Sequence, residues 1–70
     1  MKKYLVKVRS TQGGLQPVLL FDPLAVIEPS YEGDTGKEGG TEEYEILTRF
    51  DLDRVLDLSP EVVEYTSEEV

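Results

Sequence analysis

Hydrophobic and polar residues alternate clearly near the beginning of the chain. Every second position there carries a β-branched or aromatic side chain, namely Tyr4, Val6 and Val8. A period of two with such residues is typical of a half-buried strand. The pattern therefore predicts a strand over residues 3–9.

A glycine pair separates this strand from the next apolar run. Residues 12–14 have the composition of a turn, and residues 15–21 then predict a second strand that pairs with the first in a hairpin. Pro17 has no amide hydrogen, which places it at the start of that strand or at a sheet edge. Asp22 and Pro23 fit either a kink between two extended segments or a single helical turn, and the kink is the preferred interpretation.

The middle of the chain predicts two short strands and a loop between them. Residues 24–27 are apolar and stop before Pro29, which indicates a short buried strand. Residues 32–42 contain four glycines and no aliphatic side chain, so they predict a flexible loop. Alternation resumes at residues 44–48 and predicts a further strand with an acidic outer face.

The last third of the chain changes to helical spacing. Asp51 is a suitable N-cap, and the apolar residues after it are spaced as on one helix face, which predicts a short helix ending before Pro60. Alternate apolar residues in the same stretch also fit a strand, so both structures remain open for residues 51–57. Residues 61–66 predict a last strand, and residues 67–70 are expected to fray.

These elements belong to an α+β fold that is mostly β. We expect a small antiparallel sheet, or a partly open barrel, of four to five strands with one short helix. A chain of 70 residues supports one hydrophobic core, so residues 1–70 should form a single small domain.

Cysteine and histidine are absent from the chain. Their absence removes disulfides, thiol nucleophiles, the usual neutral-pH base and the commonest transition-metal ligand. Paired carboxylates remain, but acid–base catalysis needs a desolvated carboxyl in a substrate cleft, which so short a chain rarely builds. We therefore expect a protein that is not an enzyme and holds no cofactor.

The formal net charge is −8, from seven basic and fifteen acidic residues. Residues 22–70 contain three of the basic residues and all of the acidic ones. A field of this sign repels phosphates and anionic lipids, so neither nucleic acid nor a membrane is an expected direct partner. A basic protein surface is the expected partner, in the cytoplasm because no export segment is recognisable. The competing interpretation is that the acidic residues serve only to keep the protein soluble.

Eight acidic residues recur at short intervals in the second half of the chain and form the predicted partner-binding set. On a strand, alternate residues such as Glu43 and Glu45 lie about 6.6–6.8 Å apart, a repeat that resembles adjacent phosphates of a nucleic-acid strand. In size, charge and carboxylate spacing the chain resembles small acidic inhibitors, often encoded by phages, that mimic DNA to block nucleases, CRISPR effectors, polymerases or repressors. This resemblance implies a DNA-mimic inhibitor of a nucleic-acid-binding protein. The eight residues are Glu42, Glu43, Glu45, Asp51, Asp53, Asp57, Glu61 and Glu64.

Two other functions remain open. Apolar strands at residues 18–21 or 24–27 would pair with a second copy, which gives a small assembly module that forms a homodimer. A calcium loop that begins at Asp34 would place Glu42 and Glu45 at its ninth and twelfth positions. In that case the chain would be a regulatory domain that binds a divalent cation weakly.

Overall fold

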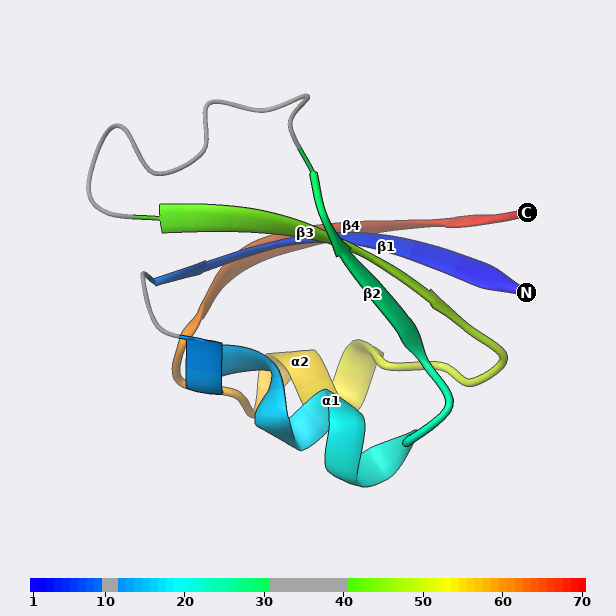
Figure 1. Cartoon of the computed structure of the whole chain (residues 1–70), viewed down its shortest axis with the longest axis horizontal. Helices are drawn as coiled ribbons and strands as arrows, with labels where there is room; N and C mark the ends of the chain where they lie inside the picture. Colours follow the sequence, from blue (N-terminus) through cyan, green and yellow to red (C-terminus); the bar gives the residue numbers. More distant parts are fainter. Residues whose placement is uncertain (10–11, 31–40) are drawn as a thin grey trace.

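The computed structural model describes residues 1–9, 12–30 and 41–70. These residues form two layers, with helices on one face of an antiparallel sheet and no described element on the other (Figure 1). The predicted α+β, mostly β class is confirmed, with an open four-stranded sheet and two short α-helices instead of one. In chain order the elements are β1 (Lys2–Arg9), the 3-10 helix η1 (Gln12–Leu15), α1 (Gln16–Phe21), β2 (Val26–Pro29), β3 (Thr41–Thr48), α2 (Asp53–Asp57) and β4 (Val62–Glu69).

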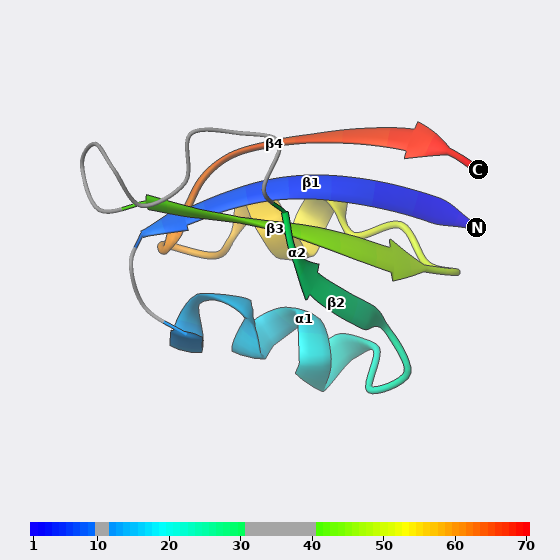
Figure 2. The ribbon, with the colours of Figure 1, turned by 45° about the horizontal axis from the view of Figure 1, so that its top comes forward.

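The sheet has the strand order β2-β3-β1-β4, and all neighbouring strands are antiparallel. β1 therefore lies inside the sheet, between β3 and the C-terminal strand β4 (Figure 2). Tyr4, Val6 and Val8 are completely buried toward the helices, and the side chains between them face the uncovered side. The strand predicted over residues 3–9 is confirmed.

Residues 15–21 are helical, so the predicted second strand and N-terminal hairpin are wrong. Both edges of β1 are occupied by β3 and β4, which leaves no place beside it for a hairpin partner. Pro17 lies in the first turn of α1, where its missing amide hydrogen costs no hydrogen bond and its fixed φ suits the helix. Val18 points into the core, whereas Leu20 and Phe21 are exposed.

Asp22 follows the last residue of α1, and its hydrogen bonds connect the next turn to the sheet. Its buried carboxylate accepts the hydroxyl of Thr48 at 2.5 Å and the amide hydrogen of Leu24 at 3.1 Å. The strand that follows, β2 at Val26–Pro29, begins two residues later than the buried strand predicted at residues 24–27, and it is mostly exposed because it lies at a sheet edge. A terminal proline is tolerated there because β2 is an edge strand.

β3 confirms the strand predicted over residues 44–48 and begins earlier, at Thr41. The glycine-rich loop predicted at residues 32–42 therefore overlaps the first two residues of the strand. Its other residues, 32–40, lie outside the described part of the chain. Ile46 is buried in the core, so the odd-numbered residues of β3 face the uncovered side.

Residues 53–57 form α2, which decides between the helix and the strand left open for residues 51–57. The predicted cap is shifted, because the N-cap position belongs to Leu52 and no side chain caps it. The Asp51 carboxylate instead accepts the amide hydrogen of Asp53 at 2.9 Å from one position earlier. A first-turn amide is thus satisfied by the expected side chain.

β4 extends the strand predicted over residues 61–66 as far as Glu69. Glu69 lies opposite Lys2 of β1, and the amide of Val70 donates to the carbonyl of Met1 at 3.0 Å. These last residues, which we expected to fray, are therefore paired with β1. Pairing with an interior strand supplies the backbone hydrogen bonds that a free terminus lacks.

The core lies between the sheet and the helices. It takes residues from β1, β3 and the helical segments, so that the helices are held by apolar contact with one face of the sheet. No helix of the described residues is long and apolar enough to cross a membrane. The buried hydrophobic residues are Tyr4, Val6, Val8, Leu15, Val18, Ile46, Leu52 and Leu56.

Candidate protein-binding site

The predicted site carboxylates are divided between the two sides of the sheet. Glu43 and Glu45 of β3 lie on the uncovered side, and so does Glu64 of β4, which is opposite an outward-facing lysine of β1. A second group of three lies at α2, on the helix-covered side. This group consists of Asp51, Asp53 and Asp57.

Lysines of β1 compensate the carboxylates of the uncovered side. The Nζ atom of Lys3 lies 3.1 Å from Glu45 and 3.8 Å from Glu68. The Nζ atom of Lys7 lies 3.3 Å from Glu64. The row of carboxylates on β3 therefore runs beside a row of lysines, and the uncovered side has a mixed charge pattern.

Glu42 and Glu61 lie apart from both groups. The hydroxyl of Tyr44 donates to Glu42 at 2.8 Å near the start of β3. The backbone carbonyl of Glu61 accepts the amide hydrogen of Arg9 at 2.9 Å, just before β4 begins. Gly14 packs closely there, since a Cβ at its position would lie 3.1 Å from the Cβ of Glu61. Both glutamates therefore belong to the margin of the sheet.

A groove between α1 and α2 brings the remaining three carboxylates next to exposed apolar side chains. Leu20 is 81% exposed, Leu58 76% and Phe21 51%. Contiguous apolar side chains in the open, rimmed by polar residues, mark protein interaction sites. We name this feature the α1–α2 groove; it is lined by Phe21, Asp51, Asp53, Arg54, Val55, Asp57 and Leu58 and continues along Pro17, Leu20 and Ser59.

An aromatic pair positions the apolar wall of the groove. The rings of Phe21 and Phe50 meet edge to face, with their centroids 5.7 Å apart. The amide of Phe50 donates to the hydroxyl of Thr48 at 3.1 Å, and that hydroxyl donates to the carboxylate of Asp22. The end of α1 is thus tied to the end of β3, which holds Phe21 in place although half of its surface is exposed.

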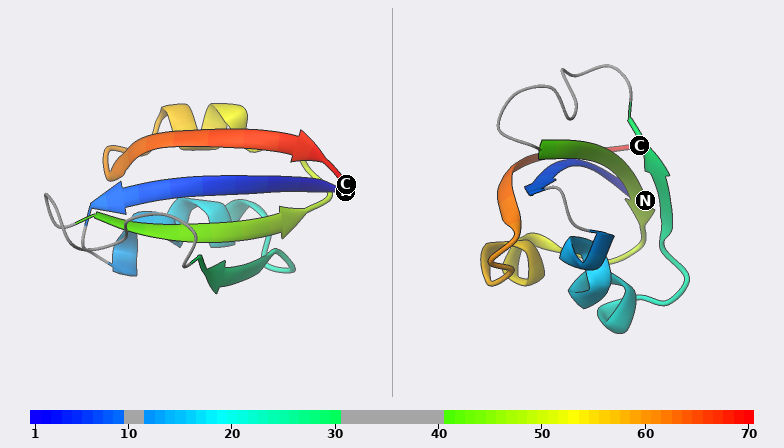
Figure 3. Two further views of the ribbon diagram at one scale, coloured as in Figure 1. Left: turned by 90° about the horizontal axis from the view of Figure 1, so that it is seen from above. Right: turned by 60° about the vertical axis from the view of Figure 1, so that its left-hand side comes forward.

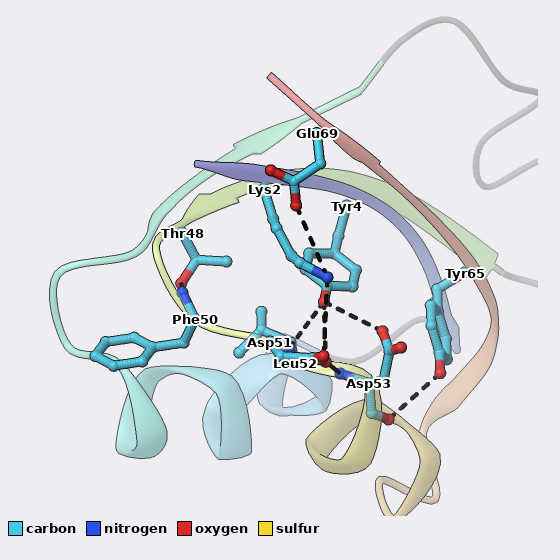
Figure 4. Close-up of polar contacts among 9 residues, drawn as sticks. All are labelled: Lys2, Tyr4, Thr48, Phe50, Asp51, Leu52, Asp53, Tyr65 and Glu69. Atoms are coloured by element: carbon cyan, nitrogen blue, oxygen red, sulfur yellow. Dashed lines mark hydrogen bonds and ion pairs between the residues drawn. The ribbon is translucent and has the colours of Figure 1, made fainter.

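The side chain of Tyr4 extends from β1 through the core to the groove carboxylates of Asp51 and Asp53 (Figure 4). The amide of Leu52 donates to the Tyr4 hydroxyl at 2.8 Å, and this hydroxyl donates to Asp53 Oδ1 at 3.1 Å. Asp51 Oδ1 lies 3.4 Å from the same oxygen. Burial raises the pKa of Tyr4 to about 12, with a smaller contribution in the same direction from Asp53. A neutral hydroxyl anchored in the core therefore orients two carboxylates of the groove.

Tyr65 of β4 holds the third carboxylate. Its hydroxyl donates to Asp57 Oδ1 at 2.7 Å and lies 3.3 Å from the backbone carbonyl of Asp53. Donation to Asp57 raises the pKa of Tyr65 to about 12. The ring centroids of Tyr65 and Tyr4 are 6.2 Å apart, so the two tyrosines stand next to each other against α2.

Asp51 contributes to stability in a way that depends on pH. Its carboxylate accepts the amide hydrogen of Asp53 at 2.9 Å and lies 3.8 Å from Lys2 Nζ. These contacts, the amide first, hold the pKa of Asp51 below its usual range. The folded chain binds this proton less readily than the unfolded chain. The stabilisation is therefore present above the usual pKa and is lost as the pH falls through the folded value.

We expect Asp51→Asn to lower stability at neutral pH and to remove part of the decrease in stability as the pH falls through and below the usual aspartate pKa of about 3.9. The amide oxygen of asparagine still accepts a hydrogen bond, so the change isolates the charge. Urea denaturation from acidic to neutral pH measures the effect, with Glu43→Gln as a control for the loss of one carboxylate on the other side of the sheet. If the free energy of unfolding changed with pH in the same way in the wild type and in Asp51→Asn, the role assigned to this carboxylate would be contradicted.

The exposed apolar residues of the groove, and the two tyrosines that hold its carboxylates, are absent from the predicted set. One signal for the apolar residues was available in the sequence. The apolar runs at residues 15–21 and 24–27 are longer than the buried face of one hairpin requires, which leaves apolar side chains for another surface. Tyr4 and Tyr65 carry no such signal, because their contacts with α2 depend on the strand order.

Within residues 1–9, 12–30 and 41–70, no group of three or more histidine, cysteine, aspartate or glutamate residues is arranged to hold a metal ion. The predicted calcium loop begins at Asp34, which lies outside these residues. Its last two ligands, Glu42 and Glu45, point to opposite faces of β3 because they are three positions apart in a regular strand. One ion cannot bind both carboxylates in this arrangement.

No family model, curated protein or solved structure shows a significant match to the chain. Its function is therefore inferred from the chemistry of the α1–α2 groove. Carboxylates beside exposed apolar side chains complement a surface that carries both basic and apolar residues.

Proposed function

We propose that this chain is a cytoplasmic, non-enzymatic binding protein whose α1–α2 groove receives a basic protein surface. The supporting observation is that three carboxylates line the groove together with the exposed side chains of Phe21 and Leu58, and that the exposed Leu20 lies on its continuation. Aromatic and aliphatic side chains that become buried on binding supply affinity. The carboxylates select a partner with basic residues.

The overall charge acts on the same partner before contact. A net charge of −8 attracts a basic surface over a Debye length of about 8–10 Å and raises the rate of association. Added salt screens this attraction, whereas the apolar contribution to affinity persists. A binding constant that falls with salt and then levels off is therefore expected.

An inhibitor that occludes a nucleic-acid-binding site is one form of this proposal. A basic groove that normally holds phosphates complements the carboxylates of Asp51, Asp53 and Asp57. Competition tests this form directly, because an oligonucleotide bound by the partner should displace the chain where the two sites coincide.

A homodimer through exposed apolar side chains in and near the groove is the second candidate function. Leu20 and Leu24 are 81% and 79% exposed, which favours a partner of some kind. Residues 18–21 are helical, so this segment would contribute a helix face and not the strand that the assembly hypothesis predicted. A symmetric dimer sets the carboxylates of one groove against those of the other, which favours the basic partner. A dimeric mass in light scattering that increases with salt would support the homodimer.

Affinity purification from the source organism with matched variants tests the proposal. Leu58→Ser removes an exposed apolar side chain, and Asp57→Asn removes one groove charge while keeping an acceptor for the hydroxyl of Tyr65. Glu43→Gln makes the same change of charge on the uncovered side of the sheet. The protein retained most strongly by the wild-type chain is then purified, and its affinity for each variant is measured.

We expect Leu58→Ser to weaken binding of that protein by about tenfold or more. Asp57→Asn should weaken it several-fold and reduce its dependence on salt, whereas Glu43→Gln should have less than about a twofold effect. Equal losses in Asp57→Asn and Glu43→Gln would show that net charge alone drives binding. A loss confined to Glu43→Gln would place the site on the uncovered side. Either result would refute the groove.

A further inference from the structure

The two edges of the sheet differ in length and in protection. β2 forms one edge with four residues and ends on Pro29, which cannot donate a hydrogen bond to a neighbouring strand. β4 forms the other edge with eight residues and no proline. In the described part of the chain, β1 is the sole strand that pairs with β4. Alternate residues of an edge strand direct N–H and C=O groups away from the sheet, so β4 offers a row of donors and acceptors.

α2 lies on the helix-covered side at this same edge of the sheet (Figure 3). Tyr65 of β4 contacts it through the carboxylate of Asp57, at 2.7 Å. A strand added beside β4 would therefore continue the two-layer arrangement, with α2 on one of its faces and the uncovered side on the other.

Each acidic residue of β4 lies opposite a lysine of β1. β1 thus shows which kind of sequence β4 accepts as a neighbour, namely an extended segment with basic residues opposite the glutamates. Side chains project from the faces of a strand, so each glutamate also lies within reach of a strand added at the other edge. The pairs are Glu64 with Lys7 at 3.3 Å, Glu68 with Lys3 at 3.8 Å and Glu69 with Lys2 at 4.0 Å.

A second copy of the chain is a poor occupant of this edge. β4 contains three glutamates and no basic residue, so pairing with another β4 brings like charges together. β1 is the basic strand of the chain, and both of its edges are already paired inside the sheet. The complementary strand must therefore come from a different protein.

We propose that the edge of β4 is a second binding site, which takes an extended basic segment of a partner protein as a fifth, antiparallel strand. Backbone hydrogen bonds supply affinity in this mode of recognition, and side chains supply selectivity. Two basic residues of the partner segment, four positions apart, pair with Glu64 and Glu68 and make the binding selective. The site is separate from the α1–α2 groove, so failure of one proposal leaves the other standing.

A capped peptide with the sequence of Lys2–Arg9 is the probe, because this is the strand that β4 already pairs with. Titrated into the isotope-labelled chain, it should shift alternate amides of β4 and protect them from hydrogen exchange. Amides on the α1 side of the groove, those of Leu20 and Phe21, should not change. A peptide with glutamate in place of the lysines at positions 3 and 7 should bind at least about tenfold more weakly.

N-methylation separates strand addition from general electrostatic attraction, because it removes a backbone donor without changing the charge. Methylating alternate residues along one edge of the peptide should abolish binding, and methylating the other edge should preserve it. Equal binding by the two methylated peptides would overturn the proposal. So would peptide-induced shifts confined to the groove, or no shifts in β4 at about millimolar peptide.

A double variant of the protein tests the contribution of charge, with the peptide left unchanged. Glu64→Gln with Glu68→Gln should keep the fold, because both side chains are exposed and such ion pairs add little to stability. Its affinity for the peptide should fall at least about tenfold. The matched control, Glu28→Gln with Glu43→Gln, removes the same charge elsewhere and should bind as the wild type does. Equal weakening in the two double variants would assign binding to net charge and refute the β4 site.

Discussion

Leu56→Ala is expected to lower the free energy of unfolding by about 2–5 kcal/mol. Leu56 is 1% exposed and is the buried residue of α2, so its truncation leaves a cavity between α2 and the sheet. Natural domains have a total stability of only about 5–15 kcal/mol, and a chain of 70 residues belongs near the lower end. Urea denaturation followed by circular dichroism should show a large decrease in the midpoint.

Leu58→Ala is the matched control, because Leu58 lies two residues later and is 76% exposed. We expect its stability to stay within about 0.5 kcal/mol of the wild type. A loss as large as that of Leu56→Ala would mean that the Leu58 side chain packs in the core and is not available to a partner. A stable Leu58→Ala variant with weaker partner binding would separate the packing role of α2 from its binding role.

Tyr4→Phe is expected to lower the free energy of unfolding by about 1–3 kcal/mol. The ring stays in the core, so the loss comes from the hydroxyl alone. Without it the buried amide of Leu52 has no acceptor, and the carboxylate of Asp53 loses a donor. Because both contacts are at the start of α2, partner binding in the α1–α2 groove should weaken as well.

The pH dependence of stability reports on the same hydroxyl. The pKa of Tyr4 is raised by burial to about 12, above the usual tyrosine value of about 10. As the pH rises the unfolded chain loses this proton first, so stability is complete below about pH 10 and decreases from there to about pH 12. Tyr4→Phe should show a smaller decrease, with the remainder due to Tyr65, whose pKa is also raised to about 12. Identical alkaline profiles for wild type and variant would contradict this assignment.

Strong local patterns made several elements predictable from the sequence. The strict alternation of Tyr4, Val6 and Val8 is compatible with burial of all three on one face only in an extended strand. The carboxylate of Asp51 bonds an amide two residues away, so the beginning of α2 was predictable within two residues. Such features depend on neighbours in the chain and need no knowledge of the rest of the fold.

Tertiary structure decided the conformation of residues 15–21. A short, mostly apolar run has no periodicity that distinguishes a strand from a helix. Its conformation depends on which edges of β1 are vacant, and β3 and β4 occupy both of them. The same long-range pairing kept the C-terminal strand in register to Glu69, beyond the point where the sequence predicted its end.

The pairing of the strands also determined which residues form the candidate site. The acidity of Asp51, Asp53 and Asp57 is evident in the sequence, but the apolar wall beside them comes from Phe21, which is distant along the chain. Strand order and register also place the two tyrosines against α2 and put the carboxylates of Glu43 and Glu45 on the opposite side of the sheet. The sequence by itself thus determined the charge and composition of the site. Tertiary structure determined which of its residues meet, because contacts across a sheet depend on strand order, register and the face that the helices cover.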